Sequence, residues 1–416
     1  MTSDLRAARV IVHTGKGGVG KTSVAAATAV RLASGGQRTL VASTDVAHSL
    51  ADVLDHPLGD RPTPVRPDLD AQQLSPDQRL RSGWRDIGEY LRAMLTWGGA
   101  DPLESAELAV LPGLDELFAL LDLHDHARSG RYDVIVVDCA PTAETLRLLR
   151  LPEVLGWYVE RLLPVQRHLT RALRPAVGRI TTMPVPDDGV FASVRTLYDR
   201  LQAVRGLLLD AAHTSVRMVV TADRVVLAEA RRMLTSLYLF GHHVDAVVVN
   251  RLVPERVTDP FLRGWRERQQ GLSAEIVATF GAIPRLPLEL QDGEPVGLER
   301  LATLGDRLFE RLDPAAVLHD GPRLEIERNG DGHVLRLPLP ATTSSDAELL
   351  QRGDELYITV GGYTRNVMLP AALRTAGVTS ARVTDGWLVI VLDAADQRTG
   401  AVVDRSERVA ERAASA

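Results

Sequence analysis

The chain has 416 residues, of which 45% are hydrophobic and 25% charged, and these ordinary globular values exclude a disordered or collagen-like protein. A single core rarely grows to this length, so we expect at least two domains. The net charge of −6 argues against nucleic acid as a partner, and no apolar run or signal-peptide core is present, so we expect a cytoplasmic protein without an integral membrane segment.

The N-terminal part of the chain alternates strand and helix patterns. Residues 9–14 predict a strand, the alanine-rich residues 24–34 predict a helix, and residues 38–44 predict a second strand. This βαβ order implies an α/β fold with a mostly parallel, doubly wound sheet. Further central strands are predicted at 133–138, 216–221 and 245–250, and residues 282–288 are either an edge strand or a loop because they contain prolines.

Three intervening segments carry apolar residues at helical spacing, at 84–97, 108–121 and 154–173. The stripes either pack on one another or form a helical subdomain, over about 75–128 and 150–210, whose apolar face is a docking groove.

The composition changes after residue 313. Short alternating strands separated by glycine turns follow, and residues 322–393 predict a small all-β sandwich. Residues 387–393 are apolar on both faces, which predicts a strand buried on both sides. Residues 394–416 have little periodicity and are expected to form a loose tail. The large N-terminal domain is therefore assigned to residues 1–313.

A phosphate-binding motif connects the first predicted strand to the first helix. Gly15, Gly20, Lys21 and Thr22 match GxxxxGK[ST]. Glycines let backbone N–H groups converge on phosphate oxygens, and the helix N-terminus adds positive charge. We expect Lys21 to contact the β- and γ-phosphates of ATP and the Thr22 hydroxyl to bind Mg²⁺. The predicted nucleotide-binding residues of the loop are Gly15, Lys16, Gly17, Gly18, Val19, Gly20, Lys21, Thr22 and Ser23.

The use of lysine points to the same loop. Of the 48 lysines and arginines in the chain, only Lys16 and Lys21 are lysine. Lysine is a compact point charge, whereas arginine is a planar fork that does not replace it around a phosphate. Two lysines confined to one loop therefore indicate a chemical requirement for an ammonium there.

The segment GKGGVGKTS, with a lysine at its second position, resembles the deviant Walker A motif of MinD, ParA, the nitrogenase iron protein and the ArsA/Get ATPases. In that family the additional lysine crosses a dimer interface to the partner's nucleotide. The resemblance implies that Lys16 is catalytic in trans and that the protein is a nucleotide-gated homodimer.

Other segments, in matching order over about residues 1–313, resemble the ArsA/Get group in particular. They are STDVAHSLADVL (43–54), LPGLDE (111–116), DCAPTAETLRLLRLPE (138–153), VVTADRVVLAEARRML (219–234), VVVNRL (247–252) and IPRLPLELQDGEPVGLERL (283–301). The resemblance implies that Asp45 positions or activates the attacking water, that Asp138 binds Mg²⁺, and that Asn250 recognises adenine. Asp45 follows an apolar strand and Asp138 ends another, and carboxylates at such positions can serve phosphoryl transfer.

The sequence departs from the family pattern at several positions. Val46 replaces a proline of switch I. Ala143 and Glu144 replace glycine and histidine of switch II, and this second change puts the rate of hydrolysis in doubt. Cys139 is the only cysteine, so the chain has neither a metalloid-binding cysteine cluster nor the CxxC zinc clasp of the eukaryotic targeting ATPases. A lone cysteine is most often a small buried apolar residue.

Within residues 322–393, the segments GDELYITVGGYTRNVMLP and VTDGWLVIVLD resemble the α-crystallin domain of small heat-shock proteins. The leading hypothesis is an ATPase whose dimer opens and closes to bind and release a hydrophobic client, such as a membrane-protein segment, or a membrane-associated partner. The alternatives are the energising subunit of an arsenite-type efflux pump, a holdase that uses ATP only as a conformational ligand, and a MinD/ParA-like partitioning switch.

Overall fold

The computed structural model describes residues 7–45, 49–74, 114–139, 188–330, 332–340 and 346–394, together with the single residues 89 and 342. Most of the predicted helical subdomain, the switch positions Val46, Ala143 and Glu144, and the tail beyond residue 394 lie outside these ranges. The chain divides into two compact units, which are described separately. The first is Met1–Thr14 with Lys21–Thr214 and Glu294–Ala316, and the second is Gly15–Gly20 with Ser215–Gly293 and Val317–Ala416.

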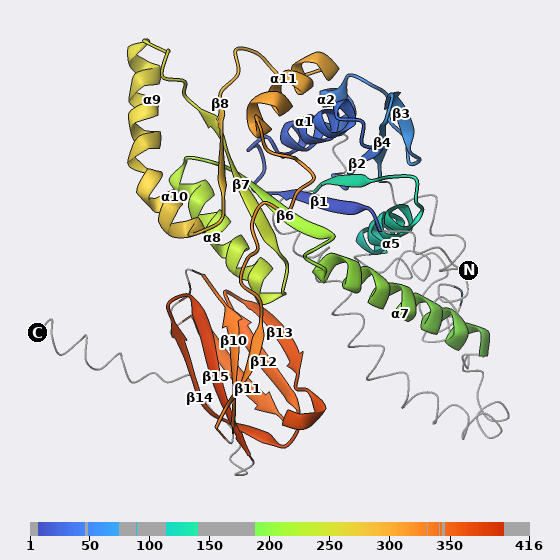
Figure 1. Cartoon of the computed structure of the whole chain (residues 1–416), viewed down its shortest axis with the longest axis vertical. Helices are drawn as coiled ribbons and strands as arrows, with labels where there is room; N and C mark the ends of the chain where they lie inside the picture. The colour runs from blue at the N-terminus through green and yellow to red at the C-terminus, as the bar shows by residue number, and fades with distance from the viewer. Residues whose placement is uncertain are drawn as a thin grey trace, which may run out of the picture. The chain divides into compact units, whose positions relative to one another are not determined.

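Five strands of the large sheet belong to the first unit, in the order β3-β4-β2-β5-β1 (Figure 1). Their neighbours pair in parallel except for β3 and β4. Strands β1, β2 and β5 confirm the strands predicted from the sequence in this unit, and all three are almost fully buried. The bounds are Arg9–Thr14 for β1, Thr39–Ser43 for β2, Thr63–Arg66 for β3, Leu69–Gln73 for β4 and Val134–Asp138 for β5.

The described helices of this unit are α1 (Lys21–Ser34), α2 (Ser49–Leu54), α5 (Leu114–Arg128), α7 (Asp188–Leu209) and α11 (Leu298–Phe309). Helix α1 begins three residues before the predicted start, directly at Lys21, and buries ten of its fourteen residues. Small alanine side chains on α1 allow close packing, and both β5 and α11 lie against it. The sheet and α11 thereby fix the direction in which the N-terminus of α1 points.

At Gly305, α11 lies close to the backbone of α1. A Cβ atom at this position would lie 2.6 Å from the carbonyl oxygen of Ala27 and 3.0 Å from Cβ of Arg31. We expect Gly305→Ala to lower the free energy of unfolding by about 1–3 kcal/mol, because the two helix backbones would have to separate. Urea unfolding of the purified protein measures this value.

Gly264 provides the matched control, because it also lies within a helix and a Cβ there would meet nothing within 4 Å. Gly264→Ala should leave stability unchanged or raise it by about 0.5–1 kcal/mol through its higher helix propensity. Equal effects of the two substitutions would show that α1 and α11 do not pack this closely.

The second unit carries the strands β6, β7 and β8 of the large sheet, which pair in parallel in that order. Strand β8 resolves the ambiguity left by its prolines, since it is an edge strand with alternating burial. Three helices, α8, α9 and α10, accompany these strands (Figure 1). The bounds are Thr214–Thr221 for β6, Arg224–Leu239 for α8, Val244–Leu252 for β7, Pro260–Gly271 for α9, Ser273–Phe280 for α10 and Arg285–Glu289 for β8.

The C-terminal part of the second unit contains two small antiparallel sheets, β14-β15-β10-β9 and β11-β12-β13. Their facing side chains, including Leu335, Leu356, Ile358 and Ile390, form one apolar core. The α/β class with a following small β domain is thus confirmed. The bounds are Glu325–Asn329 for β9, Gly332–Pro338 for β10, Ala347–Arg352 for β11, Glu355–Val360 for β12, Tyr363–Met368 for β13, Ala376–Thr384 for β14 and Trp387–Ala394 for β15, with a short 3₁₀ helix at Ala371–Leu373.

Strand β15 corrects one expectation. Leu388, Ile390 and Leu392 are fully buried, but Trp387 and the alternate valines are only half-buried. The strand is therefore apolar on both faces without being buried on both. Within the part of the chain that the structure describes, no helix combines the length and apolarity needed to cross a membrane.

Candidate functional site

The loop between β1 and α1 has a backbone that only glycine can adopt at its two ends. Gly15 has φ +150°, and a Cβ atom there would overlap the carbonyl group of Val219 on β6. Gly20 has φ +93°, and its Cβ would lie 2.5 Å from Nδ2 of Asn250 on β7. Both positions need positive φ and close backbone approach. The loop therefore has one defined path into Lys21, the first residue of α1.

Asn250 holds this loop in place. Its Nδ2 donates a hydrogen bond of 2.8 Å to the carbonyl oxygen of Val19, and its Oδ1 accepts one of 2.8 Å from the backbone N–H of Arg251. Val19 is 2% exposed and Asn250 is 8% exposed, so water does not replace these bonds. The resemblance to the ArsA/Get group implies that Asn250 contacts adenine; the structure adds a bracing contact to the loop, and the adenine contact stays a prediction.

This brace predicts the consequence of Asn250→Ala. Loss of the Asn250 amide leaves a buried carbonyl of the loop without its donor, so we expect the affinity for ATP and for tripolyphosphate to fall together, by about five- to tenfold. Isothermal titration with each compound measures the two affinities.

Gln269 supplies the control, because its amide also braces the end of β7. It donates to the carbonyl oxygen of Arg251 and accepts from the N–H of Val253. Gln269→Ala should leave both affinities unchanged. A loss confined to ATP in Asn250→Ala would assign the side chain to the base instead of the loop.

A second group of predicted residues meets in the first unit, at the carboxyl ends of β2 and β5. Ser43 and Asp138 occupy paired positions in the two strands, and the Ser43 hydroxyl donates to Oδ2 of Asp138 at 3.2 Å. Burial raises the pKa of Asp138 to about 6, although the Thr22 hydroxyl and the charge of Lys21 oppose this shift. Asp138, Thr22 and Lys21 are therefore close enough to act on one another.

Oδ1 of Asp138 can accept a ligand. Its side chain is fully buried, and its Oδ1 has no hydrogen-bond partner among the described residues. A buried carboxylate oxygen without a donor is rare in folded proteins. A hard cation would satisfy this oxygen, and carboxylate and hydroxyl oxygens are the ligands that Mg²⁺ prefers. The predicted pair Thr22 and Asp138 thus fits a magnesium ion.

Asp45 lies two residues beyond the end of β2 and is partly exposed. Its backbone is held on both sides, because its N–H donates to the Ser43 hydroxyl at 3.2 Å and its carbonyl accepts from Nε2 of Gln73 at 2.6 Å. Its charge also raises the pKa of Asp138. The side chain of Asp45 is accordingly placed near the other acidic group while remaining accessible to water.

The remaining predicted residues lie along the loop and the start of α1. Gly17 and Gly18 are exposed at the tip of the loop, and Ser23 follows Thr22 on α1, half-buried. Lys16 is half-buried, and its Nζ lies 3.0 Å from Oε2 of Glu229 on α8. Sequence reasoning missed Glu229, since a glutamate in the middle of a helix gives no local signal of its partner.

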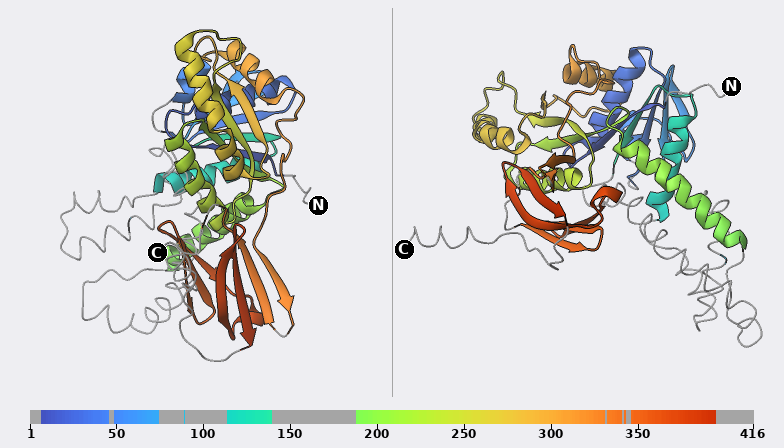
Figure 2. Two further views of the ribbon diagram at one scale, coloured as in Figure 1. Left: turned by 90° about the vertical axis from the view of Figure 1, so that its left-hand side faces the viewer. Right: turned by 60° about the horizontal axis from the view of Figure 1, so that its bottom comes forward.

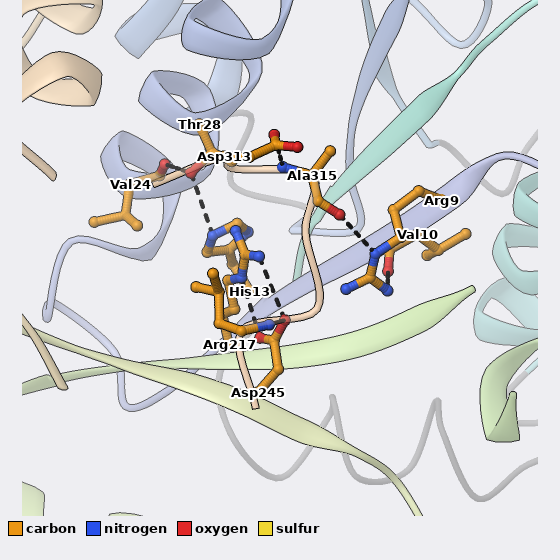
Figure 3. Close-up of polar contacts among 10 residues, drawn as sticks. Arg9, Val10, His13, Val24, Thr28, Arg217, Asp245, Asp313 and Ala315 are labelled. Atoms are coloured by element: carbon orange, nitrogen blue, oxygen red, sulfur yellow. Dashed lines mark hydrogen bonds and ion pairs between the residues drawn. The ribbon is translucent and has the colours of Figure 1, made fainter. Parts of the chain in front are cut away.

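Buried polar contacts support the strands behind the loop (Figure 3). In the first unit, the Thr28 hydroxyl donates to the carbonyl oxygen of Val24 at 2.7 Å and lies 3.4 Å from Nε2 of His13, the residue paired with Asp138. In the second unit, Nε of Arg217 lies 3.1 Å from Oδ1 of Asp245. Both side chains of that ion pair are fully buried. The first contact ties α1 to the end of β1, and the ion pair links the neighbouring strands β6 and β7.

Comparison with known proteins gives two family matches. A model described as "Anion-transporting ATPase" matches residues 8–310, and one described as "HSP20-like domain found in ArsA" matches residues 330–392. The chain is 35% identical over 388 residues to a putative arsenical pump-driving ATPase of Chlorobaculum tepidum, covering 92% of this chain and 96% of that protein. It is 33% identical to a putative arsenical pump-driving ATPase 1 of Aquifex aeolicus, over 92% and 100% of the two chains. It is 30% identical to the ATPase GET3B of Arabidopsis thaliana, over 71% and 77%.

Proposed function

Because this chain belongs to the ArsA family of anion-transporting ATPases and carries an HSP20-like domain, we propose that it is an ATP-hydrolysing dimeric switch that captures and releases a hydrophobic client. The observation that carries the nucleotide part is the phosphate loop, which Val219 and Asn250 enclose and which leads directly into Lys21 at the start of α1. Backbone N–H groups that converge at a helix N-terminus form an anion site. The triphosphate of ATP is the anion that fits this site in a family of ATPases.

Magnesium accompanies the nucleotide in this proposal. Thr22 and Asp138 would hold the ion, and the buried Oδ1 of Asp138 supports this assignment. The ion supplies positive charge that offsets the negative charge of the phosphate oxygens during phosphoryl transfer. A cation at this position would also favour the ionised form of Asp138, whose pKa is otherwise raised by burial.

In this proposal, Lys21, Asp45 and Lys16 each have a separate role in hydrolysis. Lys21 would contact the β- and γ-phosphates, and Asp45, held by Ser43 and Gln73, would orient the attacking water. Lys16 would reach the nucleotide bound by a second copy of the chain, as the deviant Walker A motif implies. Two chains would then complete each active site, so that ATP binding and closure of a homodimer would be the same event.

The client part of the proposal rests on the HSP20-like domain, which the family model places in the same chain as the ATPase domain. The names of the relatives favour a second candidate, the energising subunit of an arsenical pump. Cys139, the only cysteine of the chain, is fully buried and offers no thiolate cluster to a metalloid. We therefore expect ATPase activity to respond to an apolar helical peptide and not to arsenite; the opposite response would select the pump.

The confinement of lysine to the loop allows a direct test of nucleotide binding. Lys16 and Lys21 are the only lysine side chains that an amine-selective acylating reagent can modify. We expect Mg²⁺·ATP at saturation to slow acylation of Lys16, whose side chain is 37% exposed, by more than about tenfold, because an ammonium held by phosphate oxygens is shielded from the reagent. Lys21 is 7% exposed and should react slowly with or without nucleotide. Mass spectrometry of the loop peptide measures the rates.

Mg²⁺ with AMP, which lacks the β- and γ-phosphates, is the control and should not protect Lys16. Unchanged acylation with ATP would contradict the assignment of the loop to nucleotide binding.

A further inference from the structure

Within the second unit, helix α8 contacts the phosphate loop near one end and the C-terminal β domain at the other. Its N-terminal half carries Glu229, whose carboxylate forms the 3.0 Å ion pair with Lys16 of the phosphate loop. The two side chains are 27% and 37% exposed, so the pair is accessible to solvent and to competing ions. A phosphate that binds the Lys16 ammonium competes directly with Glu229.

The C-terminal end of α8 packs against the C-terminal β domain (Figure 2). Leu239 and Phe240 belong to the apolar core that β10, β12 and β15 form. The Thr235 hydroxyl donates to the carbonyl oxygen of Pro340 at 2.6 Å, and Nη1 of Arg365 on β13 donates to the carbonyl oxygen of Leu239 at 2.7 Å. A cation at the last carbonyls of a helix interacts favourably with the helix dipole. The contact is thus apolar, hydrogen-bonded and charge-complementary.

The ion pair itself adds little to stability, because partly exposed pairs are worth only a fraction of a kilocalorie to about 1 kcal/mol. Its placement matters more than its strength. The C-terminal half of this 16-residue helix is almost wholly buried, and close-packed interiors transmit strain. Replacing the ion-pair partner of Glu229 therefore alters the packing around Leu239, where α8 contacts the β domain.

We propose that α8 couples the phosphate loop to the C-terminal β domain: transfer of Lys16 from Glu229 to a nucleotide phosphate weakens the seating of α8 on that domain. Because coupling is reciprocal, loosening the contact between α8 and the β domain strengthens ATP binding by the same factor. The inference rests on the proposed function in one respect, namely that Lys16 contacts nucleotide. By this inference, the contact between α8 and the HSP20-like domain changes the affinity of the ATP site.

Two substitutions at opposite ends of α8 test the coupling in the full chain. Glu229→Gln removes the competing charge near Lys16, and Thr235→Val removes the hydrogen bond to Pro340 while keeping the shape of the side chain. Each should tighten ATP binding by about two- to fivefold, the range that loss of one partly exposed pair or one hydrogen bond allows. Isothermal titration with Mg²⁺·ATP measures the dissociation constants.

Each substitution has a matched control on the same helix. Arg232→Gln removes a charge from an exposed position of α8. Ser236→Ala removes a buried hydroxyl that, like that of Thr235, bonds the carbonyl four residues earlier. Both controls should bind ATP like the unmodified chain.

Hydrogen–deuterium exchange supplies the second readout. In the unmodified chain, saturating Mg²⁺·ATP should speed exchange at the amides of residues 237–241, 335–337 and 339 by about two- to fivefold. Tightened binding in Glu229→Gln alone, with Thr235→Val equal to its control, would overturn the coupling. ATP binding without any change in exchange at these amides would overturn it too. Failure of the unmodified chain to bind ATP would instead remove the proposed function, and the inference with it.

Discussion

Asp45→Asn should abolish most ATP hydrolysis while leaving ATP binding intact. The substitution keeps the shape of the side chain and the backbone contacts of residue 45 with Ser43 and Gln73, so the local structure is preserved. It removes the carboxylate that would orient the attacking water and accept its proton. Groups of this kind contribute about 100- to 10,000-fold, so kcat should fall within that range. Steady-state phosphate release and equilibrium ATP titration measure the two quantities.

Asp52→Asn is the matched control, since Asp52 is an exposed carboxylate on α2, a few residues further along the chain. Its kcat should equal that of the unmodified protein. Hydrolysis by Asp45→Asn within about threefold of that control would remove Asp45 from the reaction. Single-turnover measurements at saturating enzyme then also separate a slow ATPase from a holdase, because only the ATPase loses a chemical step in the variant.

Arg217→Ala should destabilise the protein more than any surface substitution. Both side chains of the Arg217–Asp245 pair are fully buried, and the truncation would leave the Asp245 carboxylate buried without its cation. Removing one partner of such a pair costs about 3–5 kcal/mol. Asp245 also accepts a hydrogen bond from the N–H of Leu318, so the pair holds the segment that leads into the β domain. Urea unfolding, followed by circular dichroism, gives the loss.

The chain offers a matched exposed pair for comparison. Nη1 of Arg256 lies 2.7 Å from Oε2 of Glu289, and the two side chains are 64% and 47% exposed. Arg256→Ala should therefore lower the free energy of unfolding by no more than about 1 kcal/mol. Asp245→Asn, which keeps an acceptor for Leu318, is the milder second variant. Similar losses for Arg217→Ala and Arg256→Ala would show that the buried pair is not coupled to folding.

In the large sheet, the strands that the sequence predicts without ambiguity are those that contain continuous apolar runs. Strands β1, β5, β6 and β7 are buried along nearly their whole length, and a continuous apolar run is their direct signature. Strand β4 was missed because its buried end is polar: Gln72 and Gln73 are almost inaccessible, and their amides bond the carbonyls of Asp60 and Asp45. Such partners lie 12 and 28 residues away, beyond the reach of local periodicity.

In the candidate site too, features set by adjacent residues were predictable and features set by distant contacts were not. The phosphate loop was predictable because its backbone path depends on glycines and lysines that are adjacent in sequence. The roles of Ser43 and Glu229 were not, since each acts on a residue brought near only by folding, Asp138 in one case and Lys16 in the other. The bracing role of Asn250 was hidden for the same reason, because its contact with Val19 spans 231 positions.

The claim that two chains complete one active site has a direct test in mixed dimers. Lys16→Ala and Asp45→Asn should each be inactive alone. In a mixed dimer, the site on the Lys16→Ala chain keeps its own Asp45 and receives Lys16 from its partner, so that one site is complete. With free subunit exchange, an equimolar mixture should regain about a quarter of the wild-type ATPase rate, since about half of the dimers are mixed and each has one working site. No recovery, with exchange shown by labelled subunits, would mean that Lys16 acts on the nucleotide of its own chain.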